Sequence, residues 1–560
     1  MRGIRGVTTL ACVVALAWAV PGPVAADETL VVARMVRTMD PSRPVATALA
    51  YDADGRLLAV GDAGALAQRW PGANRVDLGD ATIVPGLIDA HGHVAGLGLS
   101  RMRADLEGTR DRAEVLERLR AFEATLEAGE WLLGRGWDQN DWPVKAFPTA
   151  ADLDAAFPDR PVWLERIDGH AGWANTAALR AVGQSLDADD ARGDWHPDGG
   201  RIVRDADGRA TGILVDAAMA LVDGVVPAGD DASMERALSL GMQEAVRVGL
   251  TGVHDAGVSL RQMEAYRRLA DRGELPLRVH AMADGDGAAL DWLCREGTYR
   301  HPGGRLQMRA VKFYVDGALG SRGAALLEDY SDDPGNRGLL LATPAQLAAA
   351  VAKARDCGIQ VATHAIGDRG NRVVLDAYAA ALDGHAGLRW RIEHAQVLAP
   401  ADLPRLAALD VIASMQPTHA TSDMPWAVER LGPERVHGAY AWRSLRDSGA
   451  RLALGSDFPV ESVDPRLGLL AAATRADRAG QPVGGWLPGE VLTPYEALRG
   501  FTRDAAWAGF AEAEVGQLRE GLRADFVVLA EDPLAMPASE LDALTVLSTW
   551  VDGRPVYRRP

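Results

Sequence analysis

Cysteine is scarce in this chain, and its scarcity excludes a disulfide-stabilised scaffold. The 560 residues include three cysteines, Cys12, Cys294 and Cys357, whereas small secreted domains held by disulfides need several pairs. Cys294 lies in DWLCREG, and Cys357 lies on a helical stretch before the next strand. One bond between these two is possible, but we expect two unpaired, buried thiols.

Runs of basic residues and long apolar segments are also missing. The formal net charge is −18, and such an acidic balance argues against nucleic acids and anionic membranes as partners. After the first residues, no apolar segment is long enough to cross a bilayer. We therefore expect no nucleic-acid partner and no membrane span in the mature chain, while 48% hydrophobic residues suffice for a large core.

The first 26 residues have the pattern of a secretory signal peptide. Arg2 and Arg5 precede an apolar stretch from Val7 to Val20, then a Pro/Gly break and a VAA site. A buried N-terminal helix is the alternative, but it does not explain the basic start or the break. Cleavage after Ala26 leaves 534 residues and changes the net charge from −18 to −20. This pattern predicts an exported protein, periplasmic or secreted.

The most informative motif is HGH, within PGLIDAHGHV at residues 85–94. His91 and His93 end a predicted strand with a spacing of two, which places both imidazoles on one face. Two imidazoles on one face can bind a single metal ion. Two core or surface histidines would give the same pattern, so the rest of the chain must decide.

Later segments each place a metal-binding side chain where an apolar, β-rich run ends in a turn. They are Lys312 in RAVKFYVDGALGSRG, His364 in IQVATHAIGD, His394 in WRIEHAQV and Asp457 in RLALGSDFPV. Strands that alternate with helical stretches such as TPAQLAAAVAKARDCG predict βα units and a parallel sheet. In a closed (β/α)8 TIM barrel, the strand ends converge on one face. The six side chains would then meet in one mouth, where they suit a pair of divalent ions.

Segments around the barrel predict additional structure. Residues 27–82 and 486–560 carry short alternating stretches with the hairpin signals DADG and VDGRPV, which predict a small β-sandwich formed by both termini. The barrel then spans residues 83–485. Inside it, the interval of about residues 97–248 is far longer than one βα unit needs. Its aromatic and glycine-rich motifs suit an inserted cap region over the pocket, or an inert structural insertion.

The candidate metal ligands occur along the chain in the order HxH, Lys, His, His and Asp. In this order the chain resembles the two-metal members of the metal-dependent amidohydrolase superfamily. It is similar in particular to the branch of N-substituted formamide deformylase-like amidohydrolases, amidohydrolase family 3. The motifs that carry this similarity are GRGWDQNDWP (134–143), LERIDGHAGWANTAAL (164–179), GLTGVHDAG (249–257), VDGALGSRGA (315–324), SMQPTHATSDMPWA (414–427) and GSDFPVE (455–461). The resemblance covers nearly the whole mature chain.

The resemblance implies two divalent metal ions, and we expect zinc because imidazoles mixed with carboxylates suit it. One ion would be held by His91, His93 and Asp457, and the other by His364 and His394. Lys312 would bridge the two ions.

The bridging role of Lys312 requires a chemical modification. An ordinary lysine has a pKa of about 10.4 and repels a metal ion as an ammonium, so the neutral amine must add carbon dioxide and become a carbamate. A surface or salt-bridging lysine is the alternative. Its place in an apolar strand just before DGALGSRG favours the bridge.

The implied activity is hydrolysis of a linear amide C–N bond in an N-substituted formamide or an N-acyl amine. Two ions would acidify the water between them, and Asp457 would take a proton and return it to the leaving nitrogen. An esterase, a lactonase or a deaminase of a heterocycle would use the same site. A non-catalytic binding or regulatory protein should have lost part of the ligand set, which is intact.

Candidate substrate contacts lie in turns and in the insertion. They are Trp137, Asp138, His170, Asp316, Arg322 and His419. His419, after the predicted seventh strand, is the first choice. Asp316 and Arg322 could orient Lys312 or bind a polar group, although such residues in turns more often bond the backbone. His170 and His254 could support a ligand or be structural. We expect a small-molecule substrate and, as a possible assembly, a homodimer.

Overall fold

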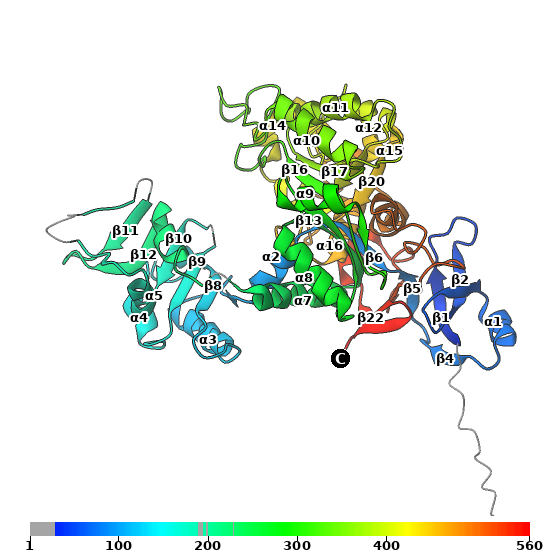
Figure 1. The fold of residues 1–560 in the computed structure, drawn as a ribbon, viewed down its shortest axis with the longest axis horizontal. Coiled ribbons are helices and arrows are strands. Elements are labelled where there is room, and N and C mark those ends of the chain that lie inside the picture. The colour runs from blue at the N-terminus through cyan, green and yellow to red at the C-terminus, as the bar shows by residue number, and fades with distance from the viewer. Residues whose placement is uncertain (1–27, 168, 189–193, 198–199, 228) are drawn as a thin grey trace, which may run out of the picture.

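The computed structural model describes residues 28–167, 169–188, 194–197, 200–227 and 229–560. The predicted signal peptide, residues 1–26, lies outside these residues. Figure 1 shows a central barrel, a sheet formed by both ends of the chain on one side, and a separate lobe on the other. Within the described part of the chain, no helix is long and apolar enough to span a membrane.

Eight parallel strands of the described chain form a barrel, which confirms the predicted α/β fold class. Their order is β20-β19-β18-β17-β16-β14-β13-β6. A bridge from Gly92 to Phe458, just after β20, nearly closes the circle. The strands are β6 (Leu87–Gly92), β13 (Leu250–Val258), β14 (Arg278–Asp284), β16 (Leu306–Tyr314), β17 (Gln360–Ala365), β18 (Arg391–His394), β19 (Ile412–Met415) and β20 (Arg451–Leu454).

Helices cover the outside of the barrel. They include α7 (Asp231–Arg247), α8 (Leu260–Asp271), α9 (Ala288–Glu296), α10 (Pro344–Asp356), α11 (Asp368–Leu382), α12 (Leu403–Ala408), α13 (Pro417–Asp423), α14 (Ala427–Arg435), α15 (Trp442–Asp447) and α16 (Pro465–Thr474). All residues of β6, β18 and β19 are buried, as expected for parallel strands covered on both faces. The strands can therefore carry polar side chains only where these are paired or lie at the strand ends.

Both ends of the chain join one sheet beside the barrel. β21 pairs antiparallel with β5, with Phe526 opposite Pro85, and a turn at Asp52–Gly55 joins β2 to β3, where Gly55 has a φ of +77°. The strands are β1 (Glu28–Arg37), β2 (Val45–Asp52), β3 (Leu57–Gly61), β4 (Asn74–Asp77), β5 (Thr82–Pro85), β21 (Phe526–Leu529), β22 (Val546–Val551) and β23 (Arg554–Arg558). The first and last strands of the described chain therefore lie in the same sheet, next to the barrel.

The C-terminal part of this sheet begins later than residue 486. α17 (Pro494–Arg499) and α18 (Ala505–Ala508) come first. Ala505 of α18 shares a buried cluster with Ile88 of β6 and Ala453 of β20. Small side chains let this segment pack against the amino-terminal ends of the strands, so it forms the floor of the barrel.

The insertion folds as a separate lobe, drawn in cyan in Figure 1. α2 (Val94–Arg101) leads into it and packs on α7, and an added Cβ at Gly98 would lie 1.7 Å from the Ala237 carbonyl oxygen. Its strands form one sheet in the order β11-β12-β10-β9-β8-β7. The elements are β7 (Ala104–Asp105), α3 (Arg112–Glu123), β8 (Leu132–Trp137), α4 (Ala150–Asp154), β9 (Val162–Arg166), β10 (Ala171–Ala174), α5 (Thr176–Ala181), β11 (Gly200–Arg204) and β12 (Ala210–Asp216).

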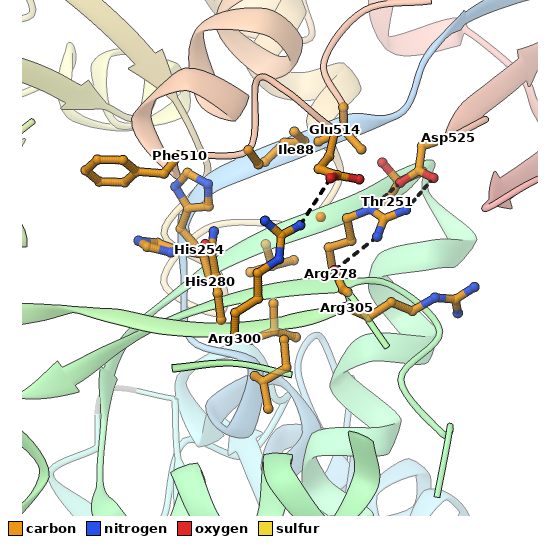
Figure 2. A pocket seen from close by; sticks show the side chains of 18 residues that line it. Ile88, Thr251, His254, Arg278, His280, Arg300, Arg305, Phe510, Glu514 and Asp525 are labelled. Carbon is orange, nitrogen blue, oxygen red and sulfur yellow. Dashed lines mark hydrogen bonds and ion pairs between the residues drawn. The ribbon is translucent and has the colours of Figure 1, made fainter. Parts of the chain in front are cut away.

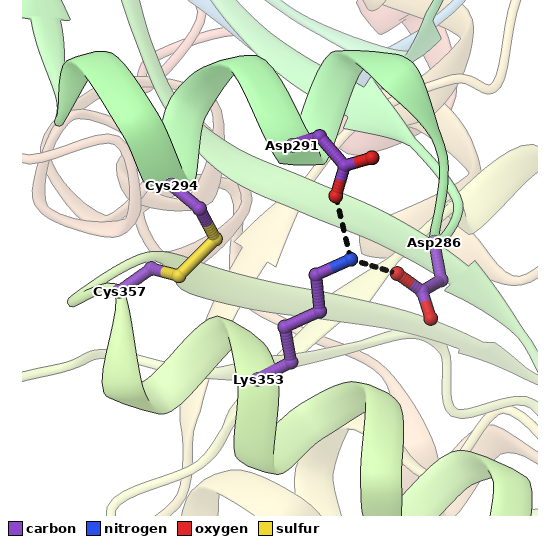
Figure 3. The surroundings of a disulfide bond; sticks show 5 residues. All are labelled: Asp286, Asp291, Cys294, Lys353 and Cys357. Carbon is purple, nitrogen blue, oxygen red and sulfur yellow. Dashed lines mark hydrogen bonds and ion pairs between the residues drawn. A yellow bond between two sulfur atoms is a disulfide. The ribbon is translucent and has the colours of Figure 1, made fainter.

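Cys294 and Cys357 form a disulfide, so the expectation of two unpaired, buried thiols is wrong (Figure 3). Cys294 lies near the end of α9, and Cys357 is the C-cap of α10. α9 packs on β14 and β16 and α10 packs on the next strand, β17, which brings the two Cα atoms to 5.0 Å. Both residues are half-buried. The sequence separation of 63 residues concealed this proximity.

Candidate metal centre

The carboxyl ends of the barrel strands bring the predicted metal ligands together. β6 carries His91 and is followed by His93, and β18 ends at His394. The Nε2 atom of His91 lies 3.3 Å from Lys312 Nζ and 3.4 Å from Asp457 Oδ1. Donor atoms of His91, His394 and Asp457 all lie within 4.8 Å of one another. These three residues are close enough to hold one ion, whereas the resemblance assigns His394 to the second ion.

The remaining two histidines border this group. His93 Nε2 lies 3.0 Å from Asp457 Oδ1, and its Nδ1 is 2.9 Å from the Ala256 carbonyl oxygen. The ring of His364 lies 4.6 Å from that of His394. His364 Nε2 is buried without a hydrogen-bond partner. An unsatisfied buried nitrogen is costly unless a ligand completes it.

The protonation states suit a divalent cation. Burial and the charge of Lys312 lower the pKa of His91 to about 4 and that of His364 to about 3. Burial opposes the ionisation of Asp457, but the hydrogen bond from His93 and the nearby His91 outweigh it, so its pKa lies well below the usual range. The neutral imidazoles of His91 and His364 and the Asp457 carboxylate are donors of the kind that bind zinc and related metals.

Lys312 lies inside the same site. It is 1% exposed, and its Nζ lies 4.8 Å from the centre of the Tyr314 ring. Burial lowers the pKa of Lys312 to about 8. A larger fraction of this lysine is therefore in the neutral amine form than of an exposed lysine. Tyr314 itself is 37% exposed and forms a wall of the site.

The backbone around two ligands is held in the left-handed region. His394 has a φ of +71° and Asp457 a φ of +64°, values that are uncommon for residues other than glycine and gather at functional sites. Asp89 stabilises this arrangement, since its carboxylate accepts from the backbone N–H groups of His91 and Ser456 at 3.0 and 3.1 Å. An added Cβ at Gly455 would lie 2.5 Å from Asp89 Oδ1, so the GSD motif needs glycine there.

His419 is the predicted substrate contact that lies at this site. It sits on α13, its ring stacks on His394 at 5.8 Å, and its Nε2 is 3.7 Å from Asp457 Oδ2. That nitrogen is buried and makes no hydrogen bond. A bound ligand would supply the hydrogen-bond partner that His419 Nε2 lacks.

The three predicted contacts in the insertion lie on its separate lobe. Trp137 is 0% exposed and lies in the lobe's own core with Trp142 and Trp173, where its indole N–H bonds the Leu164 carbonyl. A side chain with no exposed surface cannot contact a substrate, so this prediction is wrong. Asp138 is paired with Arg166 at 3.3 Å, also within the lobe. His170 is exposed on the same lobe.

Asp316 and Arg322 hold loops in place. Buried Asp316 accepts from the backbone N–H groups of Ala325, Ile366 and Gly367. It lies 3.7 Å from His364 Nε2. Arg322 bonds Asp332 at 2.8 Å. These contacts show what both residues bond in the structure, and their roles in orienting Lys312 or binding substrate stay predictions.

Sequence reasoning missed an ion pair behind His91. Arg391 and Glu393 are both completely buried and bonded to each other. Burial opposes the ionisation of Glu393, but Arg391 and His91 hold its pKa well below the usual range. The signal was present in RIEH, since two charged residues spaced by two in a buried strand must face the same interior.

Another polar region lies at the barrel floor, lined by the amino-terminal halves of β13, β14 and β16. A cavity of about 40 Å³ lies there, and Figure 2 shows His254 beside His280 at its edge. Arg278 bonds Asp525 at 2.8 Å, and Arg300 lies 3.6 Å from Glu514. The cavity has room for a few water molecules.

Comparison with known proteins agrees with the geometry of the centre. The model of the amidohydrolase family matches residues 75–557. The chain belongs to the amidohydrolase family. Membership of this family supports a metal-dependent hydrolase that acts on carbon–nitrogen bonds, with divalent metal and a small-molecule substrate.

Relatives of this amidohydrolase match it over nearly their whole length. A putative amidohydrolase, YtcJ, from Bacillus subtilis is 35% identical over 92% of this chain and 96% of its own. N-substituted formamide deformylase from Arthrobacter pascens is 30% identical over 95% and 98%. An uncharacterized metal-dependent hydrolase from Pyrococcus horikoshii has a solved structure with a TM-score of 0.75 and 28% identity, covering 91% of this chain and 99% of that one.

Proposed function

We propose that this amidohydrolase cleaves a linear amide bond in an N-substituted formamide or an N-acyl amine. The observation that carries the proposal is the convergence of neutral imidazoles, the Asp457 carboxylate and buried Lys312 at one end of the barrel. The similarity to N-substituted formamide deformylase, at 30% identity, supports this substrate class.

We further propose that the site holds two zinc ions. His91, His93 and Asp457 would hold one, and His364 and His394 the other, with carbamylated Lys312 between them. The distance of 3.3 Å between Lys312 Nζ and His91 Nε2 supports such a bridge. Elemental analysis tests this, because two zinc ions per chain are expected and one would remove the need for a bridge.

When bound, the ions supply Lewis acidity, which lowers the pKa of water and polarises a carbonyl group. The residues of the chain do the rest. Asp457 accepts the proton of the attacking water at its carboxylate and delivers it to the departing nitrogen, without which an amine leaves poorly. His419, with its free Nε2 3.7 Å from Asp457 Oδ2, binds the carbonyl oxygen or the acyl group of the substrate.

A hydrolysis screen of the zinc-loaded protein tests the reaction class. The substrates are formanilides, N-acyl amines, lactones and aminopurines at equal concentration. The proposal expects the highest kcat/KM for the amides. A preference for lactones would identify a lactonase, and ammonia release from aminopurines a deaminase; either result would refute the proposal.

We also propose that the protein is exported and dimeric. The disulfide between Cys294 and Cys357 supports export, because such bonds persist in oxidising compartments. N-terminal sequencing of the protein from a periplasmic fraction should give Asp27 as the first residue. Light scattering of the purified protein should give twice the mass of the mature chain.

A further inference from the structure

A completely buried ion pair lies directly behind His91. The Nη2 of Arg391 donates to Glu393 Oε2 at 2.9 Å, and its Nε bonds the other carboxylate oxygen. Both side chains are 0% exposed. Removing two opposite charges from water costs about as much as their attraction returns, so such a pair contributes little net stability. Its place at the centre of the barrel therefore suggests another role.

Glu393 fixes the proton on one nitrogen of His91. Its Oε2 lies 2.5 Å from His91 Nδ1. A carboxylate that pairs with a guanidinium only accepts hydrogen bonds, so Nδ1 must carry the hydrogen. The lone pair of His91 is then on Nε2, the atom that faces Lys312 Nζ and Asp457 Oδ1. The tautomer is the one that a metal ligand needs.

Arg391 is itself fixed by neighbouring strands. Its Nη2 donates to the Ala90 carbonyl on β6 and to Ser414 Oγ on β19, both at 2.5 Å. Its Nη1 donates to His254 Nδ1 on β13 at 2.9 Å. Together with its own strand β18, the guanidinium ties strands on both sides of the barrel just below the ligands. These bonds fix the guanidinium of Arg391, and the guanidinium in turn fixes the Glu393 carboxylate next to His91.

We propose that Arg391 and Glu393 are positioning residues that fix the tautomer and orientation of His91 and thereby raise the affinity of the centre for zinc. The inference rests on the proposed function only in taking His91 as a ligand. Hydrogen-bond partners of ligating histidines typically contribute about 10- to 100-fold in metal affinity. A purely structural pair would instead affect the stability of the metal-free protein and leave its zinc affinity unchanged.

The first test is the variant Glu393→Gln, which keeps the size and one acceptor oxygen but removes the charge. Zinc affinity is measured by chelator competition, on protein shown to be folded by circular dichroism. We expect affinity to fall 10- to 100-fold. The control is Glu512→Gln, which breaks a pair with Arg389 at 2.6 Å on the floor side, where Glu512 is 39% exposed, and should leave zinc affinity unchanged. A folded Glu393→Gln protein with wild-type affinity would overturn the inference.

A second test needs no change to the ion pair. In zinc-loaded wild-type protein labelled with 15N-histidine, His91 should show a slowly exchanging proton on Nδ1, assigned by its loss in His91→Asn. A proton on Nε2 would overturn the inference even if Glu393→Gln failed to fold. Wild-type protein that binds no zinc would refute both proposals, whereas zinc binding with no amide hydrolysis would refute the proposed function alone.

Discussion

Asp457 is both buried and ionised, two conditions that rarely occur together in a protein interior. It is 7% exposed, yet hydrogen bonding from His93 and the nearby His91 keep it ionised against the effect of burial. Its φ of +64° aims the carboxylate inward immediately after the last barrel strand. A buried carboxylate in a strained position suits a group that must both bind a cation and carry a proton.

We predict that Asp457→Asn retains the fold but lowers kcat/KM by about 100-fold or more, because an amide neither accepts the proton nor binds the metal as strongly. Asparagine tolerates the left-handed backbone, so the fold should survive. Circular dichroism and steady-state kinetics measure both effects. Asp77→Asn, on the exposed strand β4, is the control and should match the wild type. Near-normal activity in Asp457→Asn would exclude Asp457 as the base.

Variants of Lys312 distinguish a bridging carbamate from a charged lysine at this position. We predict that Lys312→Ala loses metal and activity, and that formate or acetate partly restores both by supplying an anionic oxygen donor. Lys312→Arg should fail, since a guanidinium cannot form the carbamate. Metal content and turnover are the measurements. Lys353→Ala is the control, because Lys353 bonds exposed acidic residues, among them Asp286 at 2.6 Å. Full activity in Lys312→Arg would exclude the bridge.

At the residue scale, the sequence was informative where spacing along one strand decided the geometry. His91 and His93 could be placed on one face from their spacing alone. The position of Trp137 could not be predicted, because an aromatic residue next to glycines has the same sequence pattern in a pocket wall as in the core of a lobe. Its contact with Trp173 on β10 decides the matter, and that residue is distant in sequence.

At the scale of elements, the alternation of strands and helices predicted the barrel because each βα unit is local in sequence. Contacts between helices of different units are not local. The contact of α9 with α10 depends on the order of β14, β16 and β17 around the barrel. The disulfide between Cys294 and Cys357 is the consequence that the sequence could not reveal.

This disulfide should stabilise the barrel by restricting the unfolded chain. We predict that the double variant Cys294→Ser and Cys357→Ser unfolds with about 2–4 kcal/mol less free energy. Urea unfolding followed by circular dichroism measures the change. Dithiothreitol should shift the wild type to the same midpoint and leave the double variant unaffected. A wild-type midpoint that does not respond to complete reduction would show that the bond contributes nothing.

At the scale of the whole molecule, the two ends of the chain fold together beside the barrel. The hairpin signals predicted the strands, but the boundary at residue 486 was too early, since alanine-rich α18 reads like a connecting segment and packs as the barrel floor. Apolar side chains of the sheet, such as Val527, pack in the same buried cluster as the barrel strands, and a charge network adds to this contact. Asp552, in the turn between β22 and β23, bonds Arg278 at 2.6 Å and Arg305 at 2.9 Å.

The network makes stability depend on pH in a defined direction. Burial opposes the ionisation of Asp552, but Arg278 and Arg305 outweigh it, so its folded pKa lies below the usual range. A carboxyl with a depressed pKa contributes stability that is complete above its unfolded pKa, about 3.9, and is lost as the pH falls through the folded value. Acid should therefore weaken the attachment of the sheet to the barrel.

We predict that Asp552→Asn lowers the free energy of unfolding by about 1–3 kcal/mol at pH 7, and that this difference from the wild type shrinks as the pH falls below about 4. Asparagine accommodates the φ of +51° at this position, so lost charge is the main change. Urea unfolding across this pH range is the measurement. Asp77→Asn removes a pair with Arg75 in which both side chains are 58% exposed, and should cost less than about 1 kcal/mol. If the deficit of Asp552→Asn were the same at pH 3 and pH 7, the carboxylate of Asp552 would not be what ties the sheet to the barrel.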